Sequence, residues 1–536
     1  MKRCGIYFSL LMVFFFSRCA FVPPAPERHP GPDIRIGLMT GKTVIEFAPT
    51  RQFVIRTADG QFIAQGDSGE RWLVTVQASK PGKTVFRLVA GSMSSRDRAR
   101  GRAREVEAFG YDTEIRPVGQ QPGPEIGDKF YRVYLKKEFQ TDTAARAFRD
   151  SIRFRFDAFL VREIREASSG LLRLTCQSRN LEYETDRPVT VTGSPVTLLD
   201  VPVGVGFHWE QKEDRTYPET VGFQFDAEGR LAAVNTLSVE TYLEGVVPSE
   251  MHPNFADEAL KAQAVAARSK TLATLGLLHT ADPFDFCADV HCQVFSGFSK
   301  VSPSTSRAVK KTAGLVLWEN GRIADAVYSS VCGGHTEDAD KAWLTAPRRH
   351  LQGVVDGPKK LKRYQPLDDE TNVRRWILDC PPANCNMLRG DVPEAVKYTQ
   401  KYFRWELTLP QAELRSQVEM RIGRSIGSIR ELLPLLRGES GRITKLKIVG
   451  SDGEAVVEGE LAIRRALSSS TLWSSCFFVE KKNGTSEAPA FILKGAGWGH
   501  GIGMCQTGAE GLALEGRRFD RILKYYFQNA QIKRIY

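Results

Sequence analysis

Four side chains of the types that bind zinc fall within 14 residues near the middle of the chain. They are His279, Cys287, His291 and Cys292, spaced 8, 4 and 1 residues apart. Two thiolates and two imidazoles make a complete tetrahedral set for zinc, which leaves no position for a reacting water. The spacing predicts a structural zinc ion, and we expect no organic cofactor. A Cys287–Cys292 disulfide with two surface histidines stays open as the alternative.

A carboxyl group lies a little earlier in the chain. Glu250 stands between two predicted helices, beside Pro248, Met251 and Pro253. Apolar surroundings raise the pKa of a carboxyl group and keep it protonated, so that it can donate a proton to a leaving group. The alternative is a carboxylate at a helix end that backbone N–H groups satisfy.

Two helices are predicted around this glutamate. The first starts near Ser238, and Pro248 is expected to stop or redirect it. The second runs from about Phe255 to Leu275, is rich in alanine and has acidic residues in its first turn, where the helix dipole favours them. The apolar positions of the first helix share one face at spacings of 0, 3, 4 and 7; they are Val239, Tyr242, Leu243 and Val246.

The N-terminal half reads mainly as strands. Short apolar runs that partly alternate with polar residues fill residues 33–76 and 166–235, and we expect them to form one β domain. Between them, residues 80–165 hold a two-fold repeat in which Phe86–Val89 aligns without gaps on Tyr131–Tyr134. Each copy reads strand, polar turn, Ala/Arg-rich helix, strand. Two such halves predict a ferredoxin-like βαββαβ unit with an open sheet face.

This repeat resembles the SPOR domain, a family that binds glycan stretches stripped of stem peptides. The resemblance lies in the strand that ends at Val89–Ser92, an alanine in the helix and Gly110 before the next strand. The second copy has Arg155 in place of that glycine. The resemblance implies a glycan-binding unit over residues 80–165.

Composition limits the class of protein. The chain has 536 residues, of which 42% are apolar and 26% charged. These values fit a multi-domain globular protein and argue against wholesale disorder or a polytopic membrane protein. The net charge of +11 suits an acidic partner such as an anionic lipid or an acidic polysaccharide. Because the chain has no long Lys/Arg block, we do not expect a nucleic-acid partner.

The N-terminus predicts export. A basic start, Met1–Arg3, precedes an apolar run from Gly5 to Phe16 that is too short to span a bilayer, so residues 1–19 read as a signal peptide. Without them the net charge is +8. A lipoprotein signal would acylate Cys19, although Arg18 stands where a small residue is usual; lipid anchoring and ordinary cleavage both stay open. We expect a periplasmic or cell-envelope location.

Export also favours disulfides among the remaining cysteines. Cys380 and Cys385 could close a small loop, with two free thiols as the alternative.

Four ordered motifs carry a second resemblance. They are YLEGVVPSEM at Tyr242–Met251 followed by Glu258–Arg268, YSSVCGGHTE at Tyr328–Glu337, SGRI at Ser440–Ile443, and GWGHGIGMCQTGA at Gly497–Ala509. Over about residues 236–536 the chain resembles the catalytic domain of the SpoIID/LytB family. The family more often has Ser and Tyr where this sequence has Cys505 and Thr507.

That resemblance implies lytic cleavage of peptidoglycan glycan strands that lack stem peptides, with Glu250 as the catalytic group. It also implies His and Cys metal ligands just after the long helix. Glycines in the last motif allow the backbone to approach a ligand or another strand closely. Substrate contacts are expected, with a structural hydrogen bond as the alternative for each, from Arg268, Ser330, His335, Thr336, His500 and Gln506.

The sequence thus predicts an α+β protein: a SpoIID-type catalytic domain with a β-rich N-terminal part and an inserted SPOR-like unit. The expected function is an exported lytic transglycosylase. The alternative is a non-catalytic amidase enhancer that binds the wall and stimulates a cell-wall amidase. A zinc hydrolase is disfavoured, because the predicted ligand set is already complete.

Overall fold

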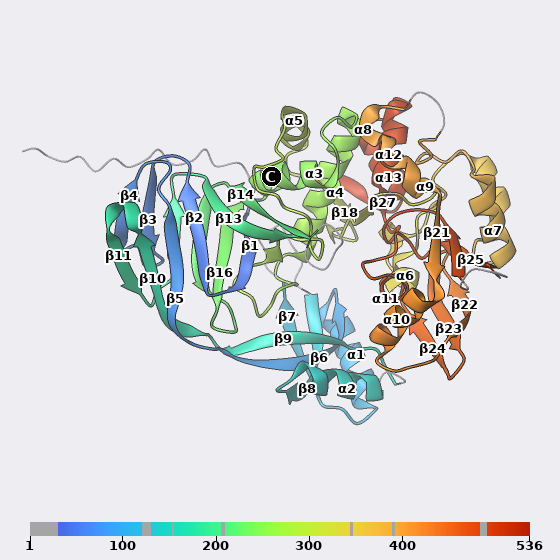
Figure 1. Cartoon of the computed structure of the whole chain (residues 1–536), viewed down its shortest axis with the longest axis horizontal. Helices are drawn as coiled ribbons and strands as arrows, with labels where there is room; N and C mark the ends of the chain where they lie inside the picture. The colour runs from blue at the N-terminus through green and yellow to red at the C-terminus, as the bar shows by residue number, and fades with distance from the viewer. Residues whose placement is uncertain are drawn as a thin grey trace, which may run out of the picture.

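The computed structural model describes residues 31–119, 130–152, 155–204, 210–343, 347–388, 392–482 and 490–536. The fold is α+β with several separate sheets (Figure 1). The predicted signal peptide and Cys19 lie outside the described residues. Among the described helices, none has the length and apolar character needed to cross a membrane.

Two facing sheets form the β-rich part. Their strand orders are β17–β1–β16–β15–β12–β3–β4 and β11–β10–β5–β2–β13–β14. The sheets share one core, in which Phe47 of β2 meets Phe223 of β15 with ring centroids 4.8 Å apart. Both sheets combine strands from residues 33–76 with strands from residues 166–235. The bounds are β1 Asp33–Lys42, β2 Val44–Pro49, β3 Phe53–Thr57, β4 Phe62–Gly66, β5 Trp72–Lys80, β10 Ser169–Cys176, β11 Leu181–Thr185, β12 Val189–Thr192, β13 Val196–Val203, β14 Gln211–Tyr217, β15 Thr220–Phe225, β16 Leu231–Ser238 and β17 Phe286–Cys287, with a 3-10 turn η1 at Gln177–Arg179.

The inserted unit lies between β5 and β10, which pair with each other from Lys80 opposite Ser169 onward. It has the predicted βαββαβ order, with antiparallel strands arranged β7–β8–β6–β9 and a core of its own. Both helices pack on one face of this sheet (Figure 1). The bounds are β6 Lys83–Met93, α1 Arg96–Glu107, β7 Thr113–Val118, β8 Phe130–Phe139, α2 Asp142–Ile152 and β9 Phe159–Glu166.

The other face of this sheet is not open throughout, so that expectation is wrong in part. Val89, Tyr134 and Val161 form a small buried cluster there. The Arg132 guanidinium donates 2.8 Å to the carbonyl of Leu277, and the Thr280 hydroxyl donates 2.9 Å to the carbonyl of Arg162. A loop of the following domain therefore covers part of this face.

Two buried helices follow the β unit: α3 Val239–Glu250 and α4 Asp257–Thr274. The Ser238 hydroxyl caps α3 by accepting from the amide of Thr241 at 3.2 Å. Pro248 lies inside α3, which ends two residues later at Glu250, so the expected stop at this proline is two residues early. Alanines along α4 let α3, α5 Pro303–Lys311, α12 Gln506–Leu514 and α13 Phe519–Tyr526 pack closely around it.

The rest of the chain adds small sheets around these helices. Strand β20 pairs in parallel with β27, and β18 lies between β19 and β28. A second core forms between sheets β21–β26–β25 and β22–β23–β24 together with α10 and α11. The bounds are β18 Leu315–Glu319, β19 Arg322–Ile323, β20 Tyr328–Ser329, α6 Ala339–Trp343, η2 Arg349–Leu351, η3 Lys359–Tyr364, α7 Glu370–Asp379, α8 Glu394–Lys397, α9 Gln400–Phe403, β21 Trp405–Pro410, α10 Gln411–Ile422, β22 Ile429–Arg437, β23 Ile443–Gly450, β24 Glu454–Glu458, α11 Glu460–Ala466, β25 Phe477–Lys482, β26 Ala490–Gly495, β27 Met504–Cys505 and β28 Gln531–Arg534.

Candidate active site

Glu250 is the last residue of α3, and its side chain is half-buried. Its Oε1 atom accepts a 3.0 Å hydrogen bond from the backbone N–H of Val294. Its backbone carbonyl accepts a 3.3 Å bond from the Nε2 atom of Gln506. Two segments far away in the sequence therefore fix both the carboxyl group and the helix end that carries it.

The surroundings favour the protonated form of this carboxyl group. Burial raises the pKa of Glu250 above its ordinary value, and this effect outweighs the opposing ones. The opposing effects come from the Val294 amide, the Lys270 charge, and the side chains of Gln506 and Tyr328. Glu250 can therefore hold a proton where an exposed glutamate would have lost it.

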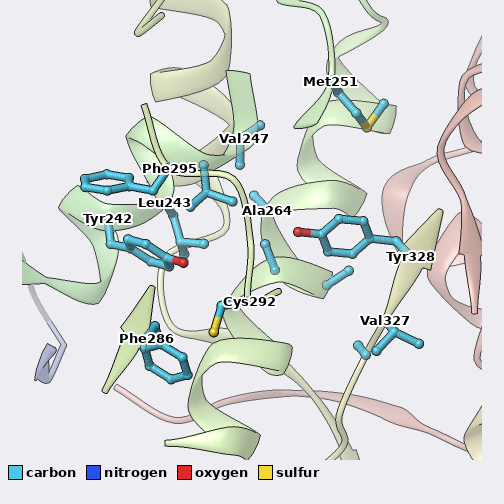
Figure 2. Packing of buried hydrophobic residues seen from close by; sticks show 14 of the residues in the cluster. Tyr242, Leu243, Val247, Met251, Ala264, Phe286, Cys292, Phe295, Val327 and Tyr328 are labelled. Carbon is cyan, nitrogen blue, oxygen red and sulfur yellow. The ribbon is translucent and has the colours of Figure 1, made fainter. Parts of the chain in front are cut away.

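A buried glutamine, Gln293, links the elements behind Glu250. Its Nε2 atom donates to the Thr271 hydroxyl at 2.8 Å and to the Tyr242 hydroxyl at 3.4 Å, and its Oε1 atom accepts from the Tyr328 hydroxyl at 2.8 Å. Figure 2 shows the two tyrosine hydroxyls pointing toward each other, with Ala264 between them. Sequence reasoning missed Gln293, whose signal was a lone amide among apolar residues directly after Cys292.

The four predicted zinc ligands converge. Their ligand atoms all lie within 4.8 Å of one another; we call His279, Cys287, His291 and Cys292 the His/Cys cluster. The Cys292 sulfur is 3.3 Å from His279 Nε2 and 3.5 Å from His291 Nδ1, and the Cys287 sulfur is 3.8 Å from His291 Nδ1. Sulfur and nitrogen ligands of one tetrahedral zinc ion are separated by about 3.6 Å.

The surroundings of the His/Cys cluster also fit a metal. His279 Nδ1 is bonded to the Asp282 carboxylate at 2.7 Å, which leaves Nε2 facing the cluster. None of the eight cysteines in the described part of the chain is in a disulfide. The cluster ends two residues before Val294, so an ion held here would fix the segment whose amide orients Glu250.

The glycine-rich loop approaches another part of the protein rather than leaving an open cradle. Gly501 has a φ of +77°, and a Cβ atom there would lie 2.3 Å from the Arg442 guanidinium carbon. Arg442 is fully buried and donates to the carbonyls of Cys332 and Gly499. Trp498 of this loop is half-buried and stacks on Tyr402 with ring centroids 4.2 Å apart.

Three of the expected substrate residues are Gln506, Ser330 and His500. Gln506 is buried and donates a hydrogen bond to the Glu250 carbonyl, while Ser330 and His500 are half-buried. Burial and the positive charges of Lys270 and Arg442 lower the pKa of His500 to about 3, so this imidazole is neutral. Its Nδ1 atom accepts from the Ile502 amide at 3.0 Å, which places the ring proton on Nε2.

The other three expected substrate residues require correction. Arg268 has no exposed side-chain surface and donates two 2.7 Å bonds to the Glu240 carboxylate, so it is committed to a buried ion pair. His335 and Thr336 are also buried. The His335 ring bonds to the Thr336 carbonyl and to Gln365, and the Thr336 hydroxyl accepts from the Val354 amide. A sugar cannot reach these groups in this conformation.

Glu337 is a buried carboxyl group that sequence reasoning did not single out. It accepts from the Ser440 hydroxyl at 2.6 Å and from the Asp338 amide at 2.9 Å. Burial raises the pKa of Glu337 to about 7 despite the nearby Arg442 charge. The SGRI motif therefore contacts both groups: Ser440 bonds the Glu337 carboxyl group, and Arg442 bonds the backbone of the glycine-rich loop.

Three family models match the chain. The Stage II sporulation protein model covers residues 227–318, the SPOR domain covers residues 82–162, and a domain of unknown function covers residues 337–503. The first two are domains of cell-envelope proteins. The α+β fold and the matched domains thus define a multi-domain protein of the cell envelope.

Matches to individual proteins give the family. An uncharacterized protein of Brachyspira hyodysenteriae is 30% identical over 305 residues, which are 56% of this chain and 68% of that protein. The amidase enhancer of Bacillus subtilis is 29% identical over 53% of this chain and 39% of its own length, and stage II sporulation protein D of the same organism is 26% identical over 56% and 76%. The chain belongs to the SpoIID/LytB family and carries a SPOR domain.

Proposed function

We propose that this protein is an exported lytic transglycosylase that cleaves peptidoglycan glycan strands lacking stem peptides, with Glu250 as general acid and then general base. The observation that carries the proposal is the state of Glu250: half-buried, oriented by the Val294 amide and raised in pKa by burial. A partly exposed, protonated carboxyl group is what proton donation to a leaving group requires.

The proposed reaction needs one carboxyl group. Glu250 donates its proton to the glycosidic oxygen as the bond from that oxygen to C1 of the sugar breaks. The resulting carboxylate then takes the proton of the same sugar's C6 hydroxyl, whose oxygen bonds to C1 and closes an anhydro ring. Hydrolytic glycosidases use a second carboxylate. Here the nucleophile is part of the substrate, so its high effective concentration takes that role.

The remaining site groups position this chemistry. His500 presents an N–H donor at Nε2, and Ser330 lies half-buried directly after β20. Both are proposed contacts for sugar hydroxyl or N-acetyl groups. Zinc in the His/Cys cluster would supply structure and no reacting water, because the four ligands complete its coordination.

The SPOR domain is proposed to supply affinity for the same glycan. Removal of a stem peptide frees the lactyl carboxylate of each N-acetylmuramic acid, so a stripped strand is a polyanion. The net positive charge of the chain favours its association with such a strand.

One observation favours a second candidate, a non-catalytic enhancer of a cell-wall amidase. A relative that is 29% identical is named amidase enhancer. In that case Glu250 would contribute to glycan binding, and the partner would perform the cleavage.

Product analysis separates the two candidates. Purified protein is incubated with amidase-treated glycan strands and, separately, with intact peptidoglycan, and the products are examined by chromatography and mass spectrometry. The transglycosylase proposal expects anhydro-ended sugars from the stripped strands only. Binding without any new sugar ends, together with faster cleavage by an added amidase, would favour the enhancer instead.

A further inference from the structure

A second group of metal-ligating side chains lies apart from the His/Cys cluster, in the core of the domain. Its members are Cys332, Asp356, Cys385 and Cys505, which we call the buried thiol cluster, and their ligand atoms all lie within 4.8 Å of one another. Each residue is at most 2% exposed. We propose that the buried thiol cluster binds a second structural zinc ion through three cysteine sulfurs and one carboxylate oxygen.

Four separate segments bring these ligands together. Cys332 follows β20, Asp356 lies between η2 and η3, Cys385 follows α7, and Cys505 is in β27 at the start of α12. Chain segments that are 24 to 173 residues apart do not converge on three sulfur atoms through local sequence preference. A closed tetrahedral site of thiolate and carboxylate ligands accounts for the convergence.

The distances suit zinc better than a disulfide. The Cys332 sulfur is 3.5 Å from the Cys385 sulfur and 3.1 Å from Asp356 Oδ2. Around one zinc ion, two sulfurs lie about 3.8 Å apart, and a sulfur and an oxygen lie about 3.6 Å apart. A disulfide would require the sulfurs to move to about 2.05 Å. Opening the cluster by a few tenths of an ångström is the smaller change.

The Asp356 carboxylate is built as a ligand. Its Oδ1 atom accepts from the Tyr526 hydroxyl at 2.7 Å and from Asn384 Nδ2 at 2.9 Å, which leaves Oδ2 facing the Cys332 sulfur. No lysine, arginine or histidine of the described residues forms an ion pair with it, although its side chain has no exposed surface. A buried carboxylate without a counter-charge is costly, and a divalent cation at Oδ2 would supply that charge.

The sulfurs also receive backbone donors. The amide of Cys332 donates to the Cys505 sulfur at 3.2 Å, Gly508 donates to the same sulfur at 3.3 Å, and Gly334 donates to the Cys332 sulfur at 3.4 Å. Cys505 is moreover the N-cap of α12, where the helix dipole favours a negative charge. A neutral buried thiol needs none of these donors, whereas a zinc-bound thiolate gains from all of them.

The second ion would join the motif that contains Cys332 to the motif that contains Cys505 and contacts Glu250 through Gln506. Cys332 begins the turn that leads to His335, and Cys505 directly precedes Gln506, whose side chain holds the Glu250 carbonyl. The His/Cys cluster would fix the segment of Val294, whose amide bonds the Glu250 carboxyl group. The buried thiol cluster would fix the segment of Gln506, whose side chain bonds the Glu250 backbone carbonyl.

Metal analysis of the purified full chain tests the inference. We expect about two zinc ions per chain in the wild type, about one in Cys385→Ser and about one in Cys292→Ser. Cys176→Ser is the matched control, because Cys176 is buried but lies outside both clusters, and it should retain two. Zinc that is lost in Cys292→Ser but unchanged in Cys385→Ser would overturn the inference.

Peptide mapping of the wild type without reductant gives an answer that does not depend on a variant's folding. We expect Cys332, Cys385 and Cys505 to be alkylated as free thiols after denaturation with a chelator. A Cys332–Cys385 cross-link would replace the second zinc site with a disulfide.

In the metal analysis, a single zinc that is lost only in Cys385→Ser would support the buried thiol cluster and remove the metal from the His/Cys cluster.

Discussion

Replacing Glu250 with glutamine removes the proton that the proposed reaction transfers while leaving the shape of the side chain. The amide oxygen of glutamine can still accept the 3.0 Å bond from Val294, so we expect the free energy of unfolding to change by less than about 1 kcal/mol. Glycan binding should also persist, because no substrate contact other than the carboxyl group is altered.

The loss of activity should be large. General acid–base catalysis contributes about 10² to 10⁴ in rate, equal to roughly 3 to 5 kcal/mol of activation free energy. Since Glu250 is proposed to serve in both proton transfers, Glu250→Gln should lose at least this factor. The assay is the initial rate of anhydro-ended sugars from amidase-treated strands. The matched control is Glu244→Gln, which alters another half-buried glutamate of α3 that faces Lys310 at 3.7 Å and should keep nearly full activity.

The pH profile provides an independent check of the same group. The acid must be protonated in the free enzyme, so kcat/KM should fall as the pH rises through the elevated pKa of Glu250. Wild-type turnover in Glu250→Gln would refute the assignment of this residue. A rate that rises steadily through the same pH range would refute its role as the acid.

Four further outcomes are expected. Deleting residues 80–165 and rejoining β5 to β10 should weaken pull-down by stripped glycan while leaving some cleavage of short soluble strands; unchanged pull-down would contradict the SPOR assignment. A chelator and, separately, Cys292→Ser should each lower the melting temperature, whereas reductant alone should not; the opposite pattern would indicate a disulfide. Arg268→Met should cost about 3 to 5 kcal/mol in denaturant unfolding because it leaves Glu240 buried and unpaired, while Lys310→Met should cost under about 1 kcal/mol. Because the pKa of Glu337 rises from 4.5 to about 7 on folding, stability should fall as the pH rises through that window, and Glu337→Gln should flatten the fall.

Much of the architecture follows from local patterns in the sequence. The alanine-rich run predicted a helix over about 255–275, and α4 spans Asp257–Thr274. The in-register repeat predicted the βαββαβ order that the inserted unit has. These features depend on periodicity within one element, which a sequence displays directly. The predicted stop at Pro248 was two residues early, because a proline does not by itself fix the residue at which a helix ends.

Contacts between distant segments could not be predicted in the same way. Arg268 lies in a motif of the family, yet its guanidinium faces Glu240 inside the helix pair and not the substrate. Whether a polar side chain faces a cleft or the core depends on the packing of elements on both sides of it. The buried thiol cluster escaped for the same reason, since Cys385 was considered only with nearby Cys380, as a disulfide loop or as two free thiols. Its actual neighbour, Cys332, is 53 residues away.

The attachment of the SPOR domain has a consequence for the length of the products of the proposed cleavage. Two strands join it to the β unit, and they pair with each other from Lys80 and Ser169 onward, so the domain cannot swivel as it would on a single flexible linker. The bonds from Arg132 and Thr280 further limit its rotation. A glycan strand bound to the SPOR domain would then reach Glu250 at a fixed number of sugars from its bound segment. The proposed cleavage should therefore release glycan fragments of a preferred length rather than fragments of random length.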